Sequence, residues 1–152
     1  MKKYIVSTLV VLGLMAVLAR PVIAGDLESL SGKWTVKKTN AEGQKYVQHI
    51  EIKKDKFTFR IASSDDETRL YAEGDVKIEK AGPFKVIVFQ NIQGGTSKSD
   101  LNPIDDTYTS IYKLDDDGWT VATNFDRDRD QKPSLDVYKK GKAETKSAKS
   151  EK

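Results

Sequence analysis

The chain has 152 residues, of which 38% are hydrophobic and 32% are charged, a composition that suits one soluble globular domain. Cysteine is absent, which excludes disulfides, thiol nucleophiles and cysteine-ligated metal sites. The single histidine, His49, makes a multi-histidine metal site or a histidine-based catalytic triad hard to build. We therefore expect no bound metal, no cofactor and no catalytic residues.

Residues 1–24 have the pattern of a secretory signal peptide. Lys2 and Lys3 precede an apolar run over residues 5–19, and small residues follow it, with cleavage expected before Gly25. The run is shorter than the roughly 20 residues that a membrane-spanning helix needs. The pattern therefore predicts export to the periplasm or the extracellular space, with no stable membrane insertion after cleavage.

Removal of residues 1–24 changes the charge balance of the chain. The full chain has 26 basic and 23 acidic residues, and the segment contains three of the basic ones and none of the acidic ones. Lysines then dominate a tail over residues 139–152, while the body over residues 25–138 is mildly acidic. A nucleic-acid-binding protein would need a basic body, so we expect no nucleic-acid partner. The tail is expected to be disordered, with a weak contact to an anionic cell envelope as its possible role.

The body shows short alternating runs of apolar and polar residues, separated by turn residues. A helical turn is expected over residues 26–30, where Leu27 and Leu30 share one side. The Gly/Ser-rich segment 93–100 is expected to form a mobile loop. Short strands at this spacing indicate an all-β barrel or sandwich. We predict eight strands, near residues 33–39, 45–53, 57–63, 68–79, 84–91, 107–114, 118–125 and 134–140.

The first predicted strand begins with a Gly-x-Trp sequence, Gly32-Lys33-Trp34, directly after the helical turn. Together with the Ile111-Tyr112 strand, the Asp-Gly hairpin and the Lys132-Pro133 pair before the last strand, it resembles the small secreted bacterial lipocalin-like (calycin) domains. The resemblance covers residues 27–138 and implies an eight-stranded antiparallel up-and-down barrel with a short N-terminal helical turn. In lipocalins a late arginine commonly stacks over the first-strand tryptophan. Here we expect one of three residues to occupy that position: Lys132, Arg127 or Arg129.

An eight-stranded barrel is just wide enough to be filled by side chains or to hold one small ligand. A mixed aromatic and polar lining is typical of small-molecule pockets. The candidate lining residues are the following: Tyr46, Gln48, Arg60, Tyr71, Phe89, Tyr108, Tyr112, Trp119 and Asn124. The sequence thus favours an exported, non-catalytic binding protein for a small hydrophobic or amphipathic ligand. The alternative is a structural or interaction protein of the cell envelope with a filled barrel.

Two further features carry weaker predictions. Asp126, Asp128 and Asp130 have the spacing that begins an EF-hand loop, but the glycine and glutamate that complete such a loop are absent. We interpret these acids, and those of the other acidic turns, as solubilising residues. His49 is expected at a surface or rim position, where its charge would follow pH.

Overall fold

The alternating runs fold into nine strands and one helical turn in the computed structural model, which describes residues 23–116, 118–125 and 132–141. The elements are α1 (Ile23–Ser29), β1 (Gly32–Thr39), β2 (Lys45–Lys53), β3 (Lys56–Ser63), β4 (Thr68–Ala81), β5 (Phe84–Ser97), β6 (Asp100–Ile104), β7 (Tyr108–Asp115), β8 (Gly118–Thr123) and β9 (Ser134–Lys140). The predicted signal peptide lies almost wholly outside these residues. Helix α1 begins two residues before the expected cleavage point.

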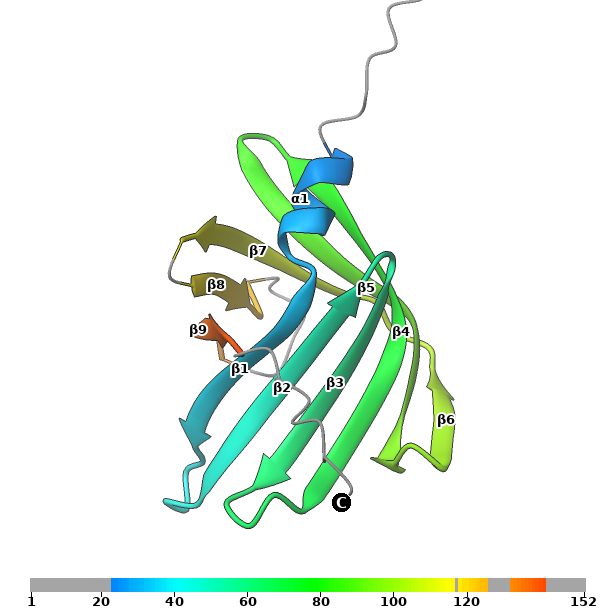
Figure 1. The fold of residues 1–152 in the computed structure, drawn as a ribbon, viewed down its shortest axis with the longest axis vertical. Helices are drawn as coiled ribbons and strands as arrows, with labels where there is room; N and C mark the ends of the chain where they lie inside the picture. Colours follow the sequence, from blue (N-terminus) through cyan, green and yellow to red (C-terminus); the bar gives the residue numbers. More distant parts are fainter. Residues whose placement is uncertain (1–22, 117, 126–131, 142–152) are drawn as a thin grey trace, which may run out of the picture.

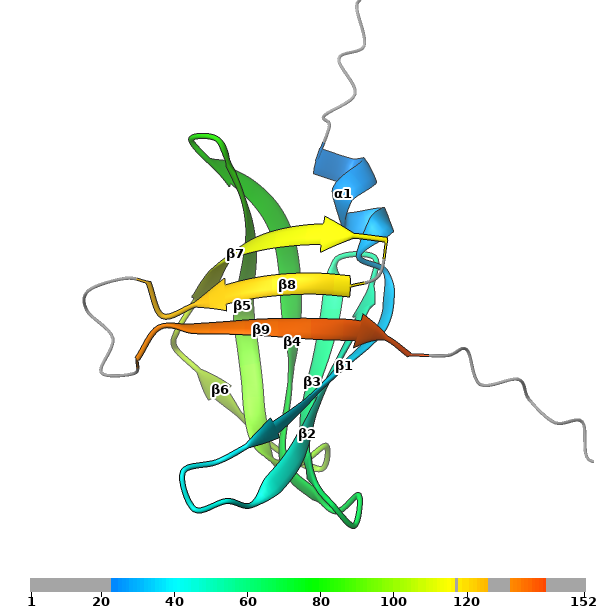
Figure 2. The ribbon, with the colours of Figure 1, turned by 90° about the vertical axis from the view of Figure 1, so that its left-hand side faces the viewer.

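The strands close into an antiparallel barrel (Figure 1). The hydrogen-bonded order runs β4-β3-β2-β1-β9-β8-β7-β5, and pairing of β5 with β4 completes the ring. Strands β7, β8 and β9 cross the direction of β3 to β5 (Figure 2). The predicted all-β fold is confirmed as an eight-stranded, lipocalin-like up-and-down barrel with a short N-terminal helical turn.

The prediction of a loop over residues 93–100 is wrong. Strand β5 continues to Ser97 and turns back into β6, which pairs with it from Ile104 to Asp100. Gly94 and Gly95 are needed here for close approach, because a Cβ on Gly95 would lie 1.6 Å from the Asp100 carbonyl oxygen. Strands β6 and β7 pair, one after the other, with the same edge of β5, and the register shifts by one residue between them. Together they therefore count as one of the eight strands of the barrel.

The seam between the first and last strands is short. β1 pairs with β9 at Trp34↔Lys140 and Thr35↔Lys139, and the Gly141 amide donates to the Lys33 carbonyl at 2.7 Å. The registered ladder stops there. Continuing the same antiparallel register places Lys38 opposite Asp136. The two strands are therefore joined by backbone near α1 and by side chains further away.

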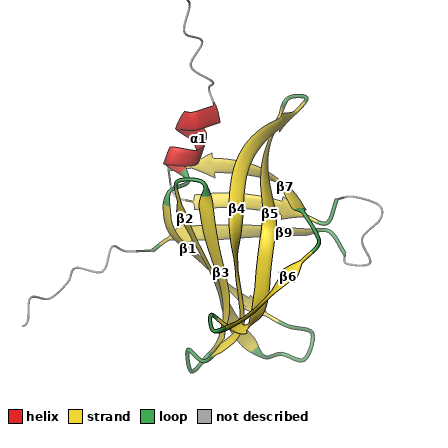
Figure 3. Ribbon diagram, turned by 90° about the vertical axis from the view of Figure 1, so that its right-hand side faces the viewer, coloured by secondary structure: helices red, strands yellow, loops and turns green. Residues whose placement is uncertain are grey.

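Helix α1 lies at one end of the barrel (Figure 3), and large hydrophobic side chains are buried beneath it. Trp34 and Trp119 pack edge to face with ring centroids 5.8 Å apart, and the indole Nε1 of Trp34 donates to the Leu30 carbonyl at 2.8 Å. Leu30 and Trp119 are fully buried. Each such side chain contributes about 1.5–3 kcal/mol through burial. Asp26 of α1 pairs with Lys85 of β5 at 2.7 Å, which adds a contact between the helix and this closed end.

The cation beside Trp34 is Lys140, whose Nζ lies 5.5 Å from the ring centroid. Of the three residues expected at this position, Lys132 is the one that the structure describes, and it lies elsewhere. The Lys132 carbonyl accepts a hydrogen bond from Asn124 at the opposite end of the barrel, and exposed Pro133 leads into β9. Arg127 and Arg129 lie outside the described residues. Lys140 holds this position because it is the register partner of Trp34.

Gly32 has a φ of 127°, a conformation that glycine allows before Trp34.

Candidate ligand-binding cavity

The barrel contains a cavity of about 400 Å³ that is open to solvent, within the roughly 300–1,000 Å³ typical of small-molecule sites. It lies toward the end opposite α1, because two of its lining residues are there: Lys38 is the penultimate residue of β1, and Leu70 lies near the start of β4. The described residues that line it are Lys38, Gln48, Ile50, Phe57, Phe59, Leu70, Ala72, Phe89, Ile92, Ile104, Tyr108, Thr109, Ser110, Trp119, Val121, Thr123, Asn124, Ser134, Asp136 and Tyr138.

Most of the cavity wall is apolar. Phe57 and Phe89 pack edge to face with centroids 4.7 Å apart. Ile50 and Phe59 are register partners on β2 and β3, and Phe59 is in turn paired with Ala72 of β4. Side chains of this kind favour burial of an aliphatic chain or a ring system.

A polar group of side chains interrupts this wall at the seam between β1 and β9. Both carboxylate oxygens of Asp136 lie 2.8 Å from the Nζ of Lys38, and the two side chains are 13% and 25% exposed. The Tyr138 hydroxyl donates to the Oε1 of Gln48 at 3.0 Å. Burial, and then the charge of Asp136, raise the pKa of Tyr138, so its phenol stays protonated as a donor. The cavity therefore combines an apolar wall with a paired charge.

The indole of Trp119 carries a buried hydrogen-bond donor. Its side chain lines the cavity and is fully buried, and its Nε1 has no hydrogen-bond partner among the described residues. A buried donor left in this state costs about 1–3 kcal/mol.

Five of the residues predicted to line a cavity do so: Gln48, Phe89, Tyr108, Trp119 and Asn124. Arg60 and Tyr71 do not. They are register partners on the face of β3 and β4 opposite to Phe59, where Arg60 pairs with Asp66 at 3.0 Å and the Tyr71 hydroxyl donates to Glu73 at 3.0 Å. The aromatic and polar character of these two residues suggested a lining role, but strand alternation places them outside.

Tyr46 and Tyr112 also lie outside the set of lining residues. Tyr46 is the register partner of Lys38, near the start of β2, and is half-buried. Tyr112 belongs to the core of the closed end, where burial and the charge of Asp26 raise its pKa to about 12. Its hydroxyl has no hydrogen-bond partner among the described residues.

Sequence reasoning missed Lys38 and Asp136. The signal was present, because Lys38 continues the alternation of Trp34 and Val36, and Asp136 that of Tyr138. A charged residue in phase with core residues on each of two strands indicates an internal pair, provided that the strands are neighbours. The closure of β1 on β9 supplies that condition.

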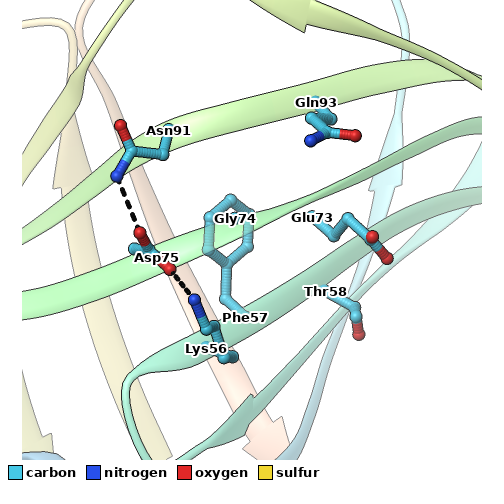
Figure 4. Close-up of a pocket in the computed structure, with 8 residues that line it drawn as sticks. All are labelled: Lys56, Phe57, Thr58, Glu73, Gly74, Asp75, Asn91 and Gln93. Carbon is cyan, nitrogen blue, oxygen red and sulfur yellow. Dashed lines mark hydrogen bonds and ion pairs between the residues drawn. The ribbon is translucent and has the colours of Figure 1, made fainter.

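A second hollow, of about 420 Å³, lies between β3, β4 and β5 (Figure 4). Figure 4 shows the Asp75 carboxylate between Asn91, whose amide donates to it at 2.7 Å, and the ammonium group of Lys56. These contacts, the amide first, lower the pKa of Asp75. The hollow adjoins the β-bulge between Glu73 and Asp75. We interpret these contacts as structural, because they join three strands where the register shifts.

Histidine and the acidic turns add no further site. His49 lies on the face of β2 opposite to Gln48, half-buried, as the register partner of Arg60. Burial and the charge of Arg60 lower its pKa, against a smaller opposing effect of Asp66. The described residues contain no cluster of three or more metal-ligating side chains, and Asp126, Asp128 and Asp130 lie outside them. No helix in the described part of the chain is long and apolar enough to span a membrane.

The fold and the cavity together define a closed eight-stranded antiparallel barrel with a partly polar interior. No family model matches the chain, and neither a curated protein nor a solved structure matches it.

Proposed function

We propose that the protein is an exported, lipocalin-like binding protein that holds a small hydrophobic or amphipathic molecule in its barrel, without catalysis. The observation that supports this function is the cavity of about 400 Å³, with an apolar wall and the Lys38–Asp136 pair on one side. The alternative is a structural or interaction protein of the cell envelope with a filled barrel, and the cavity supports the binding function over it. The proposed export rests on the signal-peptide pattern of residues 1–24.

Native mass spectrometry of the mature protein, purified from its own envelope under mild conditions, tests the proposal. We expect a reproducible additional mass that is lost on denaturation. Ala72→Phe should abolish it, because Ala72 lines the cavity and is 8% exposed. Ala81→Phe is the matched control, since Ala81 is exposed in the same strand.

Circular dichroism must show that both variants are folded. An additional mass retained equally by both would place the molecule outside the cavity. Recovery of wild-type protein without any additional mass, followed by failure to take up decanol, decanamide, decanoic acid or decylamine, would overturn the proposal. The contact of the Lys-rich tail with the envelope stays a prediction, because residues 142–152 lie outside the described part of the chain.

A further inference from the structure

The ion pair inside the cavity distinguishes between possible ligand head groups. We infer that the cavity prefers an uncharged amphipath, whose head group both donates and accepts hydrogen bonds, to a fatty acid or an alkylamine of the same chain length. This inference rests on the proposed binding function and names the class of ligand that the cavity would take.

The charges of the cavity are balanced before any ligand enters. Lys38 and Asp136 are the two charged side chains among the described residues that line it, and Nζ lies 2.8 Å from both carboxylate oxygens. The carboxylate of Asp136 is 13% exposed, so water only partly screens it. The cavity as a whole therefore offers no net charge to a ligand.

A charged head group would disturb this balance. A carboxylate that approaches the ammonium group of Lys38 also approaches the carboxylate of Asp136, which touches the same nitrogen. It must either remain desolvated beside a like charge or displace Asp136, which then remains buried without its partner. Both are unfavourable in a site of low dielectric constant. The same reasoning, with Lys38 as the repelling group, applies to an alkylammonium.

An uncharged head group can use the pair without breaking it. An ammonium group has three donors and a carboxylate has about four acceptor sites, so each ion retains bonding capacity within the pair. A hydroxyl or a primary amide can accept from Lys38 and donate to Asp136 at once. The hydroxyls of Thr123 and Ser134, 2.7 Å apart, add neutral partners in the same cavity.

Isothermal titration calorimetry of the mature protein with four decyl compounds tests the inference. At neutral pH we expect decanol and decanamide to bind at least tenfold more tightly than decanoate or decylammonium. Asp136→Asn leaves Lys38 as the single charge in the cavity lining and should improve decanoate binding, relative to decanol, at least tenfold. Lys38→Met should do the same for decylammonium.

A matched control separates the effect of this pair from a general change in charge. Lys53→Met removes one member of the exposed Lys53–Glu51 pair, of similar length at 2.9 Å, and should leave all four affinities unchanged. If decanoate binds wild-type protein as tightly as decanol, the inference is overturned while the binding function stands. If none of the four compounds binds, the proposed function fails and the inference fails with it. The wild-type comparison needs no variant, so a variant that does not fold leaves the test decisive.

Discussion

Substitution of either member of the Lys38–Asp136 pair should destabilise the ligand-free barrel, whereas substitution of both should not. At a separation of 2.8 Å, two unit charges attract by about 6 kcal/mol if the effective dielectric constant is about 20. Desolvation costs several kcal/mol per buried ion, so the intact pair contributes little net free energy. If one partner is removed, the desolvation cost of the other is no longer offset by the attraction between them.

The exposure of the two side chains sets the size of this effect. Breaking a fully buried pair costs about 3–5 kcal/mol. Because Lys38 and Asp136 are 25% and 13% exposed, we expect a smaller cost, about 2 kcal/mol for Lys38→Met or Asp136→Asn. The double variant should lie within about 1 kcal/mol of wild type, which gives a favourable coupling free energy between the two sites.

Equilibrium urea unfolding, followed by circular dichroism, measures these free energies. Lys53→Met serves as control, because Lys53 and Glu51 are 76% and 28% exposed and their pair should contribute less than about 1 kcal/mol. The reasoning is refuted if Asp136→Asn costs no more than Lys53→Met. It is also refuted if the double variant loses the sum of the two single losses.

Three further substitutions test other parts of the barrel. Tyr112→Phe removes a buried hydroxyl without a partner among the described residues, so the free energy of unfolding should stay unchanged or rise by about 1 kcal/mol in urea titrations. His49 has a folded-state pKa below its ordinary value of 6.5, so the unfolded chain binds the proton first and stability falls as pH drops through 6.5. Parallel unfolding curves between neutral and acidic pH should show a weaker fall for His49→Gln. Gly74→Ala should cost about 1–3 kcal/mol in the same urea assay, because the new Cβ would lie 2.7 Å from the Gln90 carbonyl oxygen.

Each of these predictions has a contradicting result. A clear loss of stability in Tyr112→Phe would mean that the hydroxyl has a stabilising partner. Identical pH profiles for wild type and His49→Gln would show that this side chain has the same pKa in the folded and unfolded chain. A Gly74→Ala variant as stable as wild type would show that the bulge relaxes at little cost; Gly25→Ala, where the added Cβ meets nothing within 4 Å, is its control.

The sequence predicted the barrel well because its strands alternate clearly and are separated by strong turn signals. Its main error in strand assignment, the end of β5 and the whole of β6 over residues 92–104, arose because Gly94 and Gly95 are typical of loops. In the structure they allow β5 and β6 to approach closely. A glycine in a loop and a glycine that lets two strands approach closely look the same in the sequence, so only the position of the neighbouring strand distinguishes them.

The candidate site was harder to predict, since it depends on which strands become neighbours. Phe89 and Trp119 were predicted correctly from residue type. The prediction for Arg60 is wrong, because Arg60 directly follows the lining residue Phe59 and its side chain therefore lies on the opposite face of β3. Lys38 and Asp136 lie 98 residues apart in the chain, and their pairing requires the closure of β1 on β9. The position beside Trp34 likewise depends on that register, which brings Lys140 there.

The short ladder between β1 and β9 also has a kinetic consequence. Local opening is expected to begin where the registered ladder ends, beyond Thr35 and Lys139, because fewer backbone contacts must break there. A molecule seated on both Lys38 and Asp136 would span this part of the seam and hold its two sides together. Occupancy should therefore slow hydrogen–deuterium exchange in the amides between Leu135 and Tyr138, while those of β2 and β3, which are paired along their whole length, change little.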